Sequence, residues 1–284
     1  MAKEGCRLLL PPLVVKGARF FQKKLSSRYA PDVTLEYFPH AWEEFHPVQQ
    51  TDGWNEGSVV AFERVRWEQF RRNLKGTGPL GFSHEHTDLT VVDSPWFHNI
   101  HMTFAYTLAL AAHDKKSLSV LDFGGGLGYY HLIAKAALPQ IHFDYHVREV
   151  PRMVAAGKIL NPEVIWHGDD ACLDQTYDMV LASGSLQYVH NWEEKLRQLC
   201  RATKGHLLLT RLTTVVHSPS FIAIQRAHHS EWLVWNLNYD AVLAVVRDSG
   251  LELLREFVIG DHFFIKGAPE EFVMRGWLFK ATRS

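Results

Sequence analysis

A run of glycines follows a short apolar segment near the middle of the chain. Residues 120–128 read VLDFGGGLG, in which Asp122 stands two positions ahead of the glycines Gly124, Gly125, Gly126 and Gly128. Glycine permits positive φ angles and a close approach of a ligand to the backbone, and a following helix offers unpaired N–H groups. The pattern is therefore typical of a loop that holds a nucleotide-like ligand at the end of a strand.

The spacing separates this loop from two common phosphate-binding motifs. The dinucleotide pattern G-x-G-x-x-G would place its third glycine at position 129, which is Tyr129, and no Walker-type lysine follows. A carboxylate at Asp122 favours a cationic or hydroxyl-bearing ligand over a pyrophosphate. S-adenosylmethionine has an amino group, a sulfonium, a ribose diol and no phosphate, so we predict it as the cofactor. A nicotinamide dehydrogenase, and a glycine turn that serves packing alone, are the disfavoured alternatives.

Two further acids follow the next two predicted strands. Glu149 lies about 20 residues after the glycine loop, where an acid conventionally bonds ribose hydroxyls. Its alternative role is a helix-start carboxylate beside Pro151, which the helix dipole favours. Asp169 is placed to accept a hydrogen bond from an adenine amine, although Asp170 competes with it and a solvated turn is an open alternative.

Short apolar runs alternate with helical stretches from Ser117 onward, which predicts a doubly wound α/β core. The last two strands are joined by too short a connection for a helical crossover, so we expect an antiparallel pair there. The predicted strands are Ser119–Phe123, His142–Val147, Val164–His167, Met179–Ser183, His206–Arg211, Leu251–Ile259 and Gly276–Ala281. The predicted core helices are one after the glycine loop that ends before Pro139, then Pro151–Leu160, Trp192–Cys200 and Tyr239–Asp248.

The first part of the chain has a different texture, rich in aromatic residues, proline and histidine. We interpret residues 1–115 as a mostly helical cap on the acceptor side, and 116–284 as the cofactor-binding core with an insertion at about 212–238. In the cap, Ser58 is expected to cap a helix that begins at Val59 and stops at Gly76. A second cap helix is expected over Asn99–Ala112, and residues 75–98 are expected to form a loop.

Several segments resemble one family. The loop LDFGGGLG, the segments REVPRMVAAGK and SGSLQY, and Thr210-Arg211 are similar to class I methyltransferases encoded among bacterial surface-polysaccharide genes, including those for O-antigen. The resemblance extends weakly into the cap through Leu10-Pro11-Pro12, Trp42 and Asp93. It implies a seven-stranded Rossmann-like sheet with an antiparallel last strand and S-adenosylmethionine as methyl donor. It supplies no proven acceptor.

The end of the fourth predicted strand normally faces the transferred methyl group in this fold. It reads SGSLQY, so Ser183 and Ser185 are expected near the cofactor and Gln187 near the acceptor. The segment lacks the Asn-Pro-Pro-Tyr pattern of many nitrogen methyltransferases and the carboxylate of magnesium-dependent ones, which favours a glycan or small-molecule hydroxyl. Arg211 ends the fifth strand, where it can hold a carboxylate or phosphate, or pair with a neighbouring acid.

Candidate bases for the acceptor proton come from the histidines, of which the chain has 17. His84 and His86 lie in an H-x-H-x-D segment that ends at Asp88, and His217 follows the fifth strand. The three residues of that segment would share one face if it were extended, but methyl transfer demands no metal, so we predict none. A solvated polar loop is the plain alternative.

Charge and cysteine usage restrict the partners and the compartment. Lys+Arg total 30 and Asp+Glu 31, which argues against a general nucleic-acid binder. The cysteines number three and form no CxxC pair, so a cytoplasmic location fits best. Residues 13–28 combine apolar and basic side chains on a predicted helix, which either packs on the core or contacts a membrane surface peripherally. A cofactor-binding but inactive scaffold is the rival function.

Overall fold

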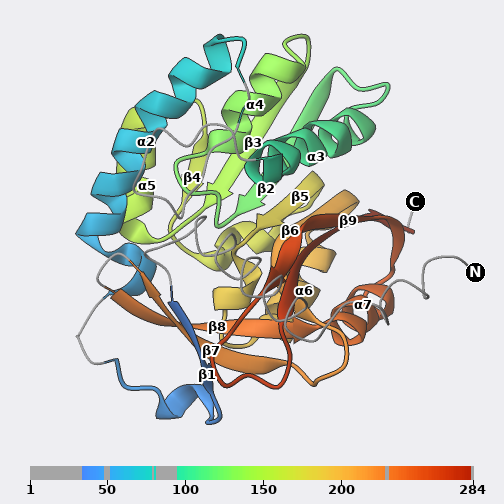
Figure 1. Ribbon diagram of the computed structural model, residues 1–284. Coiled ribbons are helices and arrows are strands. Elements are labelled where there is room, and N and C mark those ends of the chain that lie inside the picture. Colours follow the sequence, from blue (N-terminus) through green and yellow to red (C-terminus); the bar gives the residue numbers. More distant parts are fainter. Residues whose placement is uncertain (1–33, 48–51, 79, 81–94, 228–229, 283–284) are drawn as a thin grey trace, which may run out of the picture.

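The computed structural model describes residues 34–47, 52–78, 80, 95–227 and 230–282 (Figure 1). It is built from ten strands and six α-helices in the described part of the chain. The strands are β1 (Thr34–Phe38), β2 (Ser117–Phe123), β3 (His142–Arg148), β4 (Ile165–His167), β5 (Tyr177–Ser183), β6 (Thr203–Val215), β7 (Phe221–Ala227), β8 (Ser230–Asn238), β9 (Leu251–Phe263) and β10 (Phe272–Ala281). The α-helices are α2 (Gly57–Lys75), α3 (Pro95–Ala111), α4 (Tyr129–Ala137), α5 (Pro151–Leu160), α6 (Trp192–Arg201) and α7 (Tyr239–Asp248).

Seven strands form the core sheet in the order β4-β3-β2-β5-β6-β10-β9. The neighbours from β4 to β6 pair in parallel, whereas β10 runs antiparallel to both β6 and β9. The predicted doubly wound, Rossmann-like sheet with an antiparallel last strand is therefore confirmed. Helices α4, α5 and α6 connect β2 to β3, β3 to β4 and β5 to β6, and a short 3-10 turn over Asp170–Asp174 connects β4 to β5. The carboxyl ends of β2, β3 and β5 therefore meet at one edge of the sheet.

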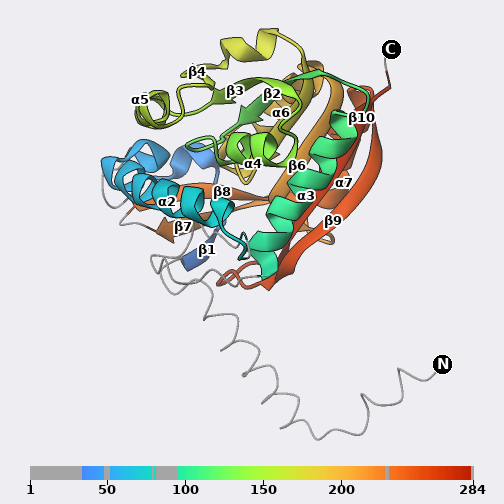
Figure 2. The same ribbon diagram turned by 90° about the horizontal axis from the view of Figure 1, so that it is seen from above.

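Both faces of the core sheet are covered, and the strand sequences explain why. Leu118 and Val120 of β2 pack into one apolar cluster, together with side chains of α2, α3, α4 and α5. Leu121 and Phe123 pack into a second cluster, together with side chains of α6 and α7. A buried parallel strand needs apolar side chains on both faces, which is why these strands read as nearly continuous apolar runs. Figure 2 shows α2, α4 and α3 on one side of the sheet.

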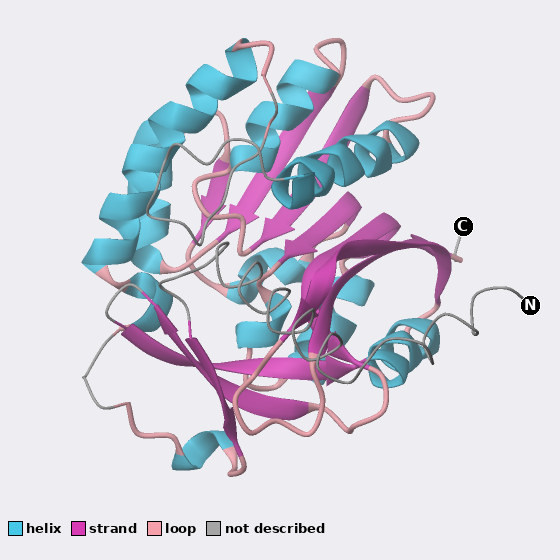
Figure 3. Ribbon diagram, in the orientation of Figure 1, coloured by secondary structure: helices cyan, strands magenta, loops and turns pink. Residues whose placement is uncertain are grey.

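A second, smaller sheet lies beyond the carboxyl edge of the core, below it in Figure 3. It has the order β1-β7-β8 with antiparallel pairs, and β8 joins the far end of β6 through Thr214 and Leu237. Residues 212–238, expected as an insertion, therefore continue β6 to Val215 and then form β7 and β8. The first 115 residues contribute β1 to this sheet in addition to the helices α2 and α3, so they are less purely helical than expected.

The helix starts in the first part of the chain differ from the expectation. Helix α2 begins at Gly57 with Glu56 as its N-cap, so Ser58 is not the cap; the N–H of Val60 bonds the Glu56 carbonyl at 3.2 Å and closes the first turn earlier. Helix α3 begins at Pro95 rather than Asn99, because a proline fits the first helical turn, where no N–H is needed. Most of the expected 75–98 loop lies outside the described residues.

Candidate functional site

The glycine loop joins β2 to α4, and three of its glycines have left-handed backbone angles. Gly124, Gly126 and Gly128 have φ of 73°, 59° and 81°. A Cβ on Gly124 would lie 2.4 Å from the Cβ of Ser185, so a side chain there would push the end of β5 away. A Cβ on Gly125 would lie 2.5 Å from the carboxylate of Asp122. The loop can follow this path only with glycine, as its spacing indicates.

Asp122 lies beneath this loop and is completely buried, with 0% of its surface exposed. Its Oδ2 accepts a hydrogen bond from the Tyr145 hydroxyl at 3.2 Å, while its Oδ1 has no hydrogen-bond partner among the described residues. Burial raises the pKa of the Asp122 carboxyl to about 8, because the charged form loses its water. A buried acceptor atom without a donor is costly, so this oxygen fits a donor or cation supplied by a ligand.

Glu149 follows β3 and faces the same loop. Its Oε1 accepts the N–H of Gly126 at 3.0 Å, and its Oε2 accepts the N–H of Val150 at 2.7 Å. Burial raises the pKa of this carboxyl above its usual range, and the two backbone donors partly oppose that shift. A carboxylate has about four acceptor positions, so Glu149 retains capacity for two hydroxyl donors. Its bond to Val150, just ahead of Pro151, also serves the helix start.

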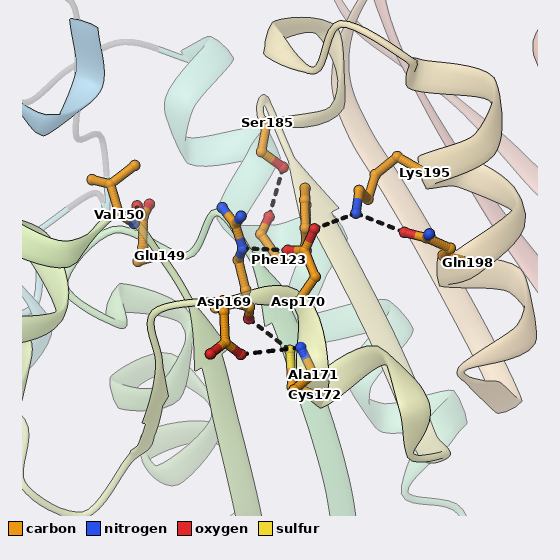
Figure 4. Close-up of polar contacts among 11 residues, drawn as sticks. Phe123, Glu149, Val150, Asp169, Asp170, Ala171, Cys172, Ser185, Lys195 and Gln198 are labelled. Atoms are coloured by element: carbon orange, nitrogen blue, oxygen red, sulfur yellow. Dashed lines mark hydrogen bonds and ion pairs between the residues drawn. The ribbon is translucent and has the colours of Figure 1, made fainter. Parts of the chain in front are cut away.

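The two acids after β4 have different surroundings (Figure 4). Asp170 receives a hydrogen bond from Arg148 Nε at 2.7 Å and an ion pair from Lys195, and these cations lower the pKa of its carboxyl despite burial. Asp169 is exposed and uses one oxygen to accept the N–H of Ala171 at 3.1 Å. Asp170 is thus engaged in a structural network that sequence reasoning missed, and Asp169 is the acid that remains open to a ligand.

Ser183 and Ser185 tie the end of β5 to the glycine loop and its helix. The Ser185 hydroxyl donates to the carbonyl of Phe123 at 2.6 Å (Figure 4), and the Ser183 hydroxyl bonds the Tyr130 hydroxyl at 2.8 Å. Burial raises the pKa of Tyr130 to about 12, so this phenol stays protonated at neutral pH. The structure brings both serines to the loop, where their hydroxyls already have partners within the protein.

Gln187 and Arg211 lie next to this segment and contact one another. The Gln187 side chain is 3% exposed, and its Nε2 donates to the Arg211 carbonyl at 3.1 Å. The guanidinium of Arg211 lies close to Gly184, because a Cβ on that glycine would be 3.3 Å from Arg211 Cζ. Gln187 therefore fixes the backbone of Arg211, a role that the sequence did not indicate.

Of the three candidate bases, only His217 lies among the described residues. His84, His86 and Asp88 lie outside the described residues, so their expected roles stay predictions. His217 is exposed in a turn beyond β6, where its N–H donates to Glu270 at 2.9 Å. Thr210 of β6 pairs with Ser183 of β5, next to the glycine loop. His217 comes seven residues later, and at about 3.3 Å per residue an extended chain covers roughly 20 Å between Thr210 and His217. The structure does not place His217 beside Ser183.

Helix α2 supplies a residue that sequence reasoning missed. Tyr129, at the position where the dinucleotide pattern has its third glycine, donates a hydrogen bond to the Glu63 carboxylate at 2.7 Å. The charge of Glu63 also helps to raise the pKa of Glu149, so α2 lies close to the site. The sequence signal for this contact was Tyr129 itself. A buried tyrosine hydroxyl at the start of α4 requires a hydrogen-bond partner, but the sequence does not show that Glu63 supplies it.

The tryptophans of the 212–238 segment pack against other aromatic residues. Trp232 contacts Trp54 with ring centroids 4.7 Å apart, and Trp54 contacts Tyr188 at 5.1 Å. Trp235 stacks on Trp42 at 5.8 Å. These contacts join the small sheet to the turn that follows β5, so the aromatic side chains serve packing, which is the plainer interpretation of the sequence.

We predict that Asp122→Asn raises the free energy of unfolding of the unliganded protein more at pH 8 than at pH 5. The pKa of Asp122 is raised to about 8, so the wild type loses stability as pH rises from about 4 to 8, and asparagine cannot ionise. The gain should grow by more than about 1 kcal/mol over that range. Urea denaturation at each pH measures it.

The control is Asp178→Asn. The pKa of Asp178 is lowered to about 2, with a hydrogen bond from Lys115 as the main stabilising contact, so this variant should lose stability at pH 8 and recover toward pH 2. A pH-independent difference for Asp122→Asn would contradict the buried, largely neutral acid described above.

Comparison with known proteins shows the family to which the chain belongs. A family described as a methyltransferase domain matches residues 96–250, which is more than half of the chain. No curated protein sequence matches. Similar solved structures include an S-adenosylmethionine-dependent methyltransferase from Clostridium acetobutylicum, with 9% identity over 66% of this chain and 93% of that chain and a TM-score of 0.45.

Two other solved structures have similar scores. A 1,6-didemethyltoxoflavin-N1-methyltransferase from Burkholderia thailandensis has 13% identity over 84% of this chain and 94% of that one, with a TM-score of 0.44. An amino pentose methyltransferase from Micromonospora echinaspora has 15% identity over 67% and 93%, with a TM-score of 0.43. The family match includes the glycine loop, Glu149 and the end of β5, and on that match the chain belongs to the class I methyltransferases that use S-adenosylmethionine.

Proposed function

We propose that the protein transfers the methyl group of S-adenosylmethionine to a hydroxyl group of a glycan or of a small molecule. The observation that carries the proposal is the buried oxygen of Asp122, which has no partner in the described part of the chain and lies beneath a loop that requires glycines. When bound, the cofactor supplies an electrophilic methyl on a sulfonium. The protein then has to hold the acceptor in line and accept its proton, and positioning alone can contribute about 7–11 kcal/mol at best.

The cofactor-binding residues in this proposal are those gathered at the carboxyl edge of the sheet. Asp122 takes a cationic or hydroxyl-bearing part, Glu149 takes the ribose hydroxyls, and Asp169 takes the adenine amine. Gly124, Gly125, Gly126 and Gly128 give the ligand access to the backbone, and Ser183 and Ser185 hold the end of β5 against the loop. This assignment is supported by the free acceptor capacity of Asp122 and Glu149 and by the exposure of Asp169.

The choice of oxygen as the methylated atom is supported by the SGSLQY segment, which lacks the Asn-Pro-Pro-Tyr pattern of many nitrogen methyltransferases. The proton acceptor is assigned to His84 or His86, because His217 lies far along β6 and Tyr130, with its pKa near 12, is a poor base at neutral pH. The division into a cap over 1–115 and a core over 116–284 belongs to the same proposal.

The setting of the reaction is proposed from the family resemblance and the sequence. We place the enzyme in bacterial surface-polysaccharide biosynthesis, in a reducing, cytoplasmic compartment, with residues 13–28 as a peripheral membrane contact. Those residues lie outside the described ones, and within the described part of the chain no helix is long and apolar enough to span a bilayer.

We predict that Asp122→Ala and Gly126→Val each weaken S-adenosylmethionine binding at least tenfold, which is about 1.4 kcal/mol. The first removes an acceptor, and the second adds a β-branched side chain at a φ of 59° in the loop. Glu149→Gln should weaken binding less than Asp122→Ala, because the amide oxygen still accepts a hydrogen bond, although the amide nitrogen then faces one of the two backbone N–H groups that Glu149 accepts. Isothermal titration calorimetry measures all three, with Gly168→Ala, which meets no atom within 4 Å, as control. If Asp122→Ala and Gly126→Val both bind S-adenosylmethionine as tightly as the wild type, the cofactor binds elsewhere on the protein.

The acceptor is tested with labelled cofactor. The protein is given methyl-labelled S-adenosylmethionine and a panel of sugars with and without an amino group. We expect the labelled methyl group to be transferred to a hydroxyl oxygen, and mass spectrometry to identify the product as a methyl ether. Transfer to the amino group would overturn the O-methyltransferase assignment. Cofactor binding without transfer to any acceptor would favour the inactive scaffold.

The membrane contact is tested by liposome flotation. The full-length protein should float with vesicles that contain phosphatidylglycerol at low salt, and deletion of residues 1–28 should abolish this, because anionic lipid attracts each lysine or arginine by about 1 kcal/mol. Flotation that is equal with and without the deletion would leave packing on the core as the role of residues 13–28.

A further inference from the structure

Arg211 has a backbone conformation that is unusual for its residue type. Its φ is 58°, in the left-handed region, and among the described non-glycine residues only Asp114 shares a positive φ. This backbone conformation costs free energy for a residue with a side chain, but not for glycine. Non-glycine residues in such conformations cluster at active sites and ligand clamps, where the surrounding structure enforces them.

The surroundings of Arg211 enforce this conformation through a β-bulge. Strand β10 pairs Arg275 with Leu212 and Trp277 with Leu209, so two residues of β6, Thr210 and Arg211, stand opposite Gly276 alone. A Cβ on Gly276 would lie 3.0 Å from Thr210 Oγ1 and 3.2 Å from the Leu209 carbonyl, so a larger residue would force these neighbours to shift by a few tenths of an ångström. A bulge bends its strand and redirects a side chain.

A second contact holds the same peptide from the other side. The buried amide of Gln187 donates to the Arg211 carbonyl at 3.1 Å, which links the turn after β5 to the bulge in β6. The bulge and this hydrogen bond together determine where the guanidinium lies. Gln187 is thus a positioning residue for Arg211.

The redirected guanidinium reaches the segment at the end of β5. It lies against Gly184, whose own φ of 65° and missing side chain make the approach possible. Its positive charge acts to lower the pKa of Tyr130, which places it near the hydroxyl pair that Tyr130 forms with Ser183. The Nε of Arg211 is buried, but the residue as a whole is half-buried, so it keeps some contact with solvent.

We propose that Arg211 is the specificity residue that binds an oxyanion, a carboxylate or a phosphate, on the methyl acceptor. A guanidinium presents paired N–H donors in a fixed planar fork that matches the two oxygens of such a group. This rests on the proposed function, because the end of β5 faces the transferred methyl only if the cofactor binds at the glycine loop. The acceptor class is then an acidic or phosphorylated sugar or small molecule rather than a neutral one.

The test uses the protein saturated with S-adenosylhomocysteine and three probes: inorganic phosphate, glucuronate and uncharged methyl glucoside. We compare the wild type with Arg211→Lys, Arg211→Ala and Arg211→Gly by calorimetry and thermal melting. Arg201→Ala, which removes an exposed arginine on α6, is the control. The wild type should bind phosphate or glucuronate and bind methyl glucoside more weakly. Arg211→Ala and Arg211→Gly should lose the anion affinity at least tenfold, and Arg211→Lys should lose less.

Melting temperatures separate anion binding from a structural role. Arg211→Gly should melt above Arg211→Ala, because glycine accepts a φ of 58° without strain. If Arg211 serves only a contact within the fold, phosphate and glucuronate raise the melting temperature of the wild type no more than that of Arg211→Gly, and the proposal is wrong.

Three further outcomes overturn the proposal. The first is anion binding that persists in Arg211→Gly, and the second is the absence of anion binding in the wild type. The third is a loss of S-adenosylhomocysteine affinity in the Arg211 variants together with the loss of anion binding. The last would assign the oxyanion to the methionine carboxylate of the cofactor. A wild type that fails to bind S-adenosylhomocysteine at all contradicts the proposed function instead.

Discussion

The rest of the site depends on one buried carboxyl group. Asp122 sits at the end of β2 with no exposed surface, and one of its oxygens receives no hydrogen bond from any residue that the structure describes. Its position leaves no room for a side chain on Gly125, and the loop above it turns through left-handed angles that only glycine adopts readily. An acid kept in such a place destabilises the unliganded fold as pH rises, which is a cost that a ligand can offset.

The elements around Asp122 hold the neighbouring strand ends in place. Glu149 bonds the loop backbone from the side of β3, and Ser185 bonds the carbonyl of Phe123 from the side of β5. Beyond that edge, the sheet β1-β7-β8 contacts the turn after β5 through Trp232, Trp54 and Tyr188. The edge that we assign to the cofactor is thus built from local β-α connections, and the region that we assign to the acceptor from contacts between distant parts of the chain.

This difference explains what the sequence predicts and what it does not. The glycine loop, the alternation of buried strands with helices, and the antiparallel β9–β10 pair depend on residues close in sequence, so spacing and periodicity reveal them. The pairing of β1 with β7 joins Phe38 to Ile222, and no local pattern indicates such a partner. The same holds for Asp170, which Arg148 and Lys195 neutralise, and for the bulge that redirects Arg211, because it depends on Gly276 of another strand. The predicted cap at Ser58 was wrong because Glu56, two residues earlier, is the N-cap and its carbonyl closes the first turn.

The central claim is that the acids at this edge of the sheet hold S-adenosylmethionine, and a crystal structure with S-adenosylhomocysteine tests it most directly. The account predicts that the ligand lies over Gly124, Gly125 and Gly126, with its ribose hydroxyls within about 3 Å of the Glu149 carboxylate and a polar group at Asp122. A ribose that lies beside Asp144 or Asp169, with Glu149 out of reach, would contradict the assignment. So would a ligand that leaves the Oδ1 of Asp122 without a partner.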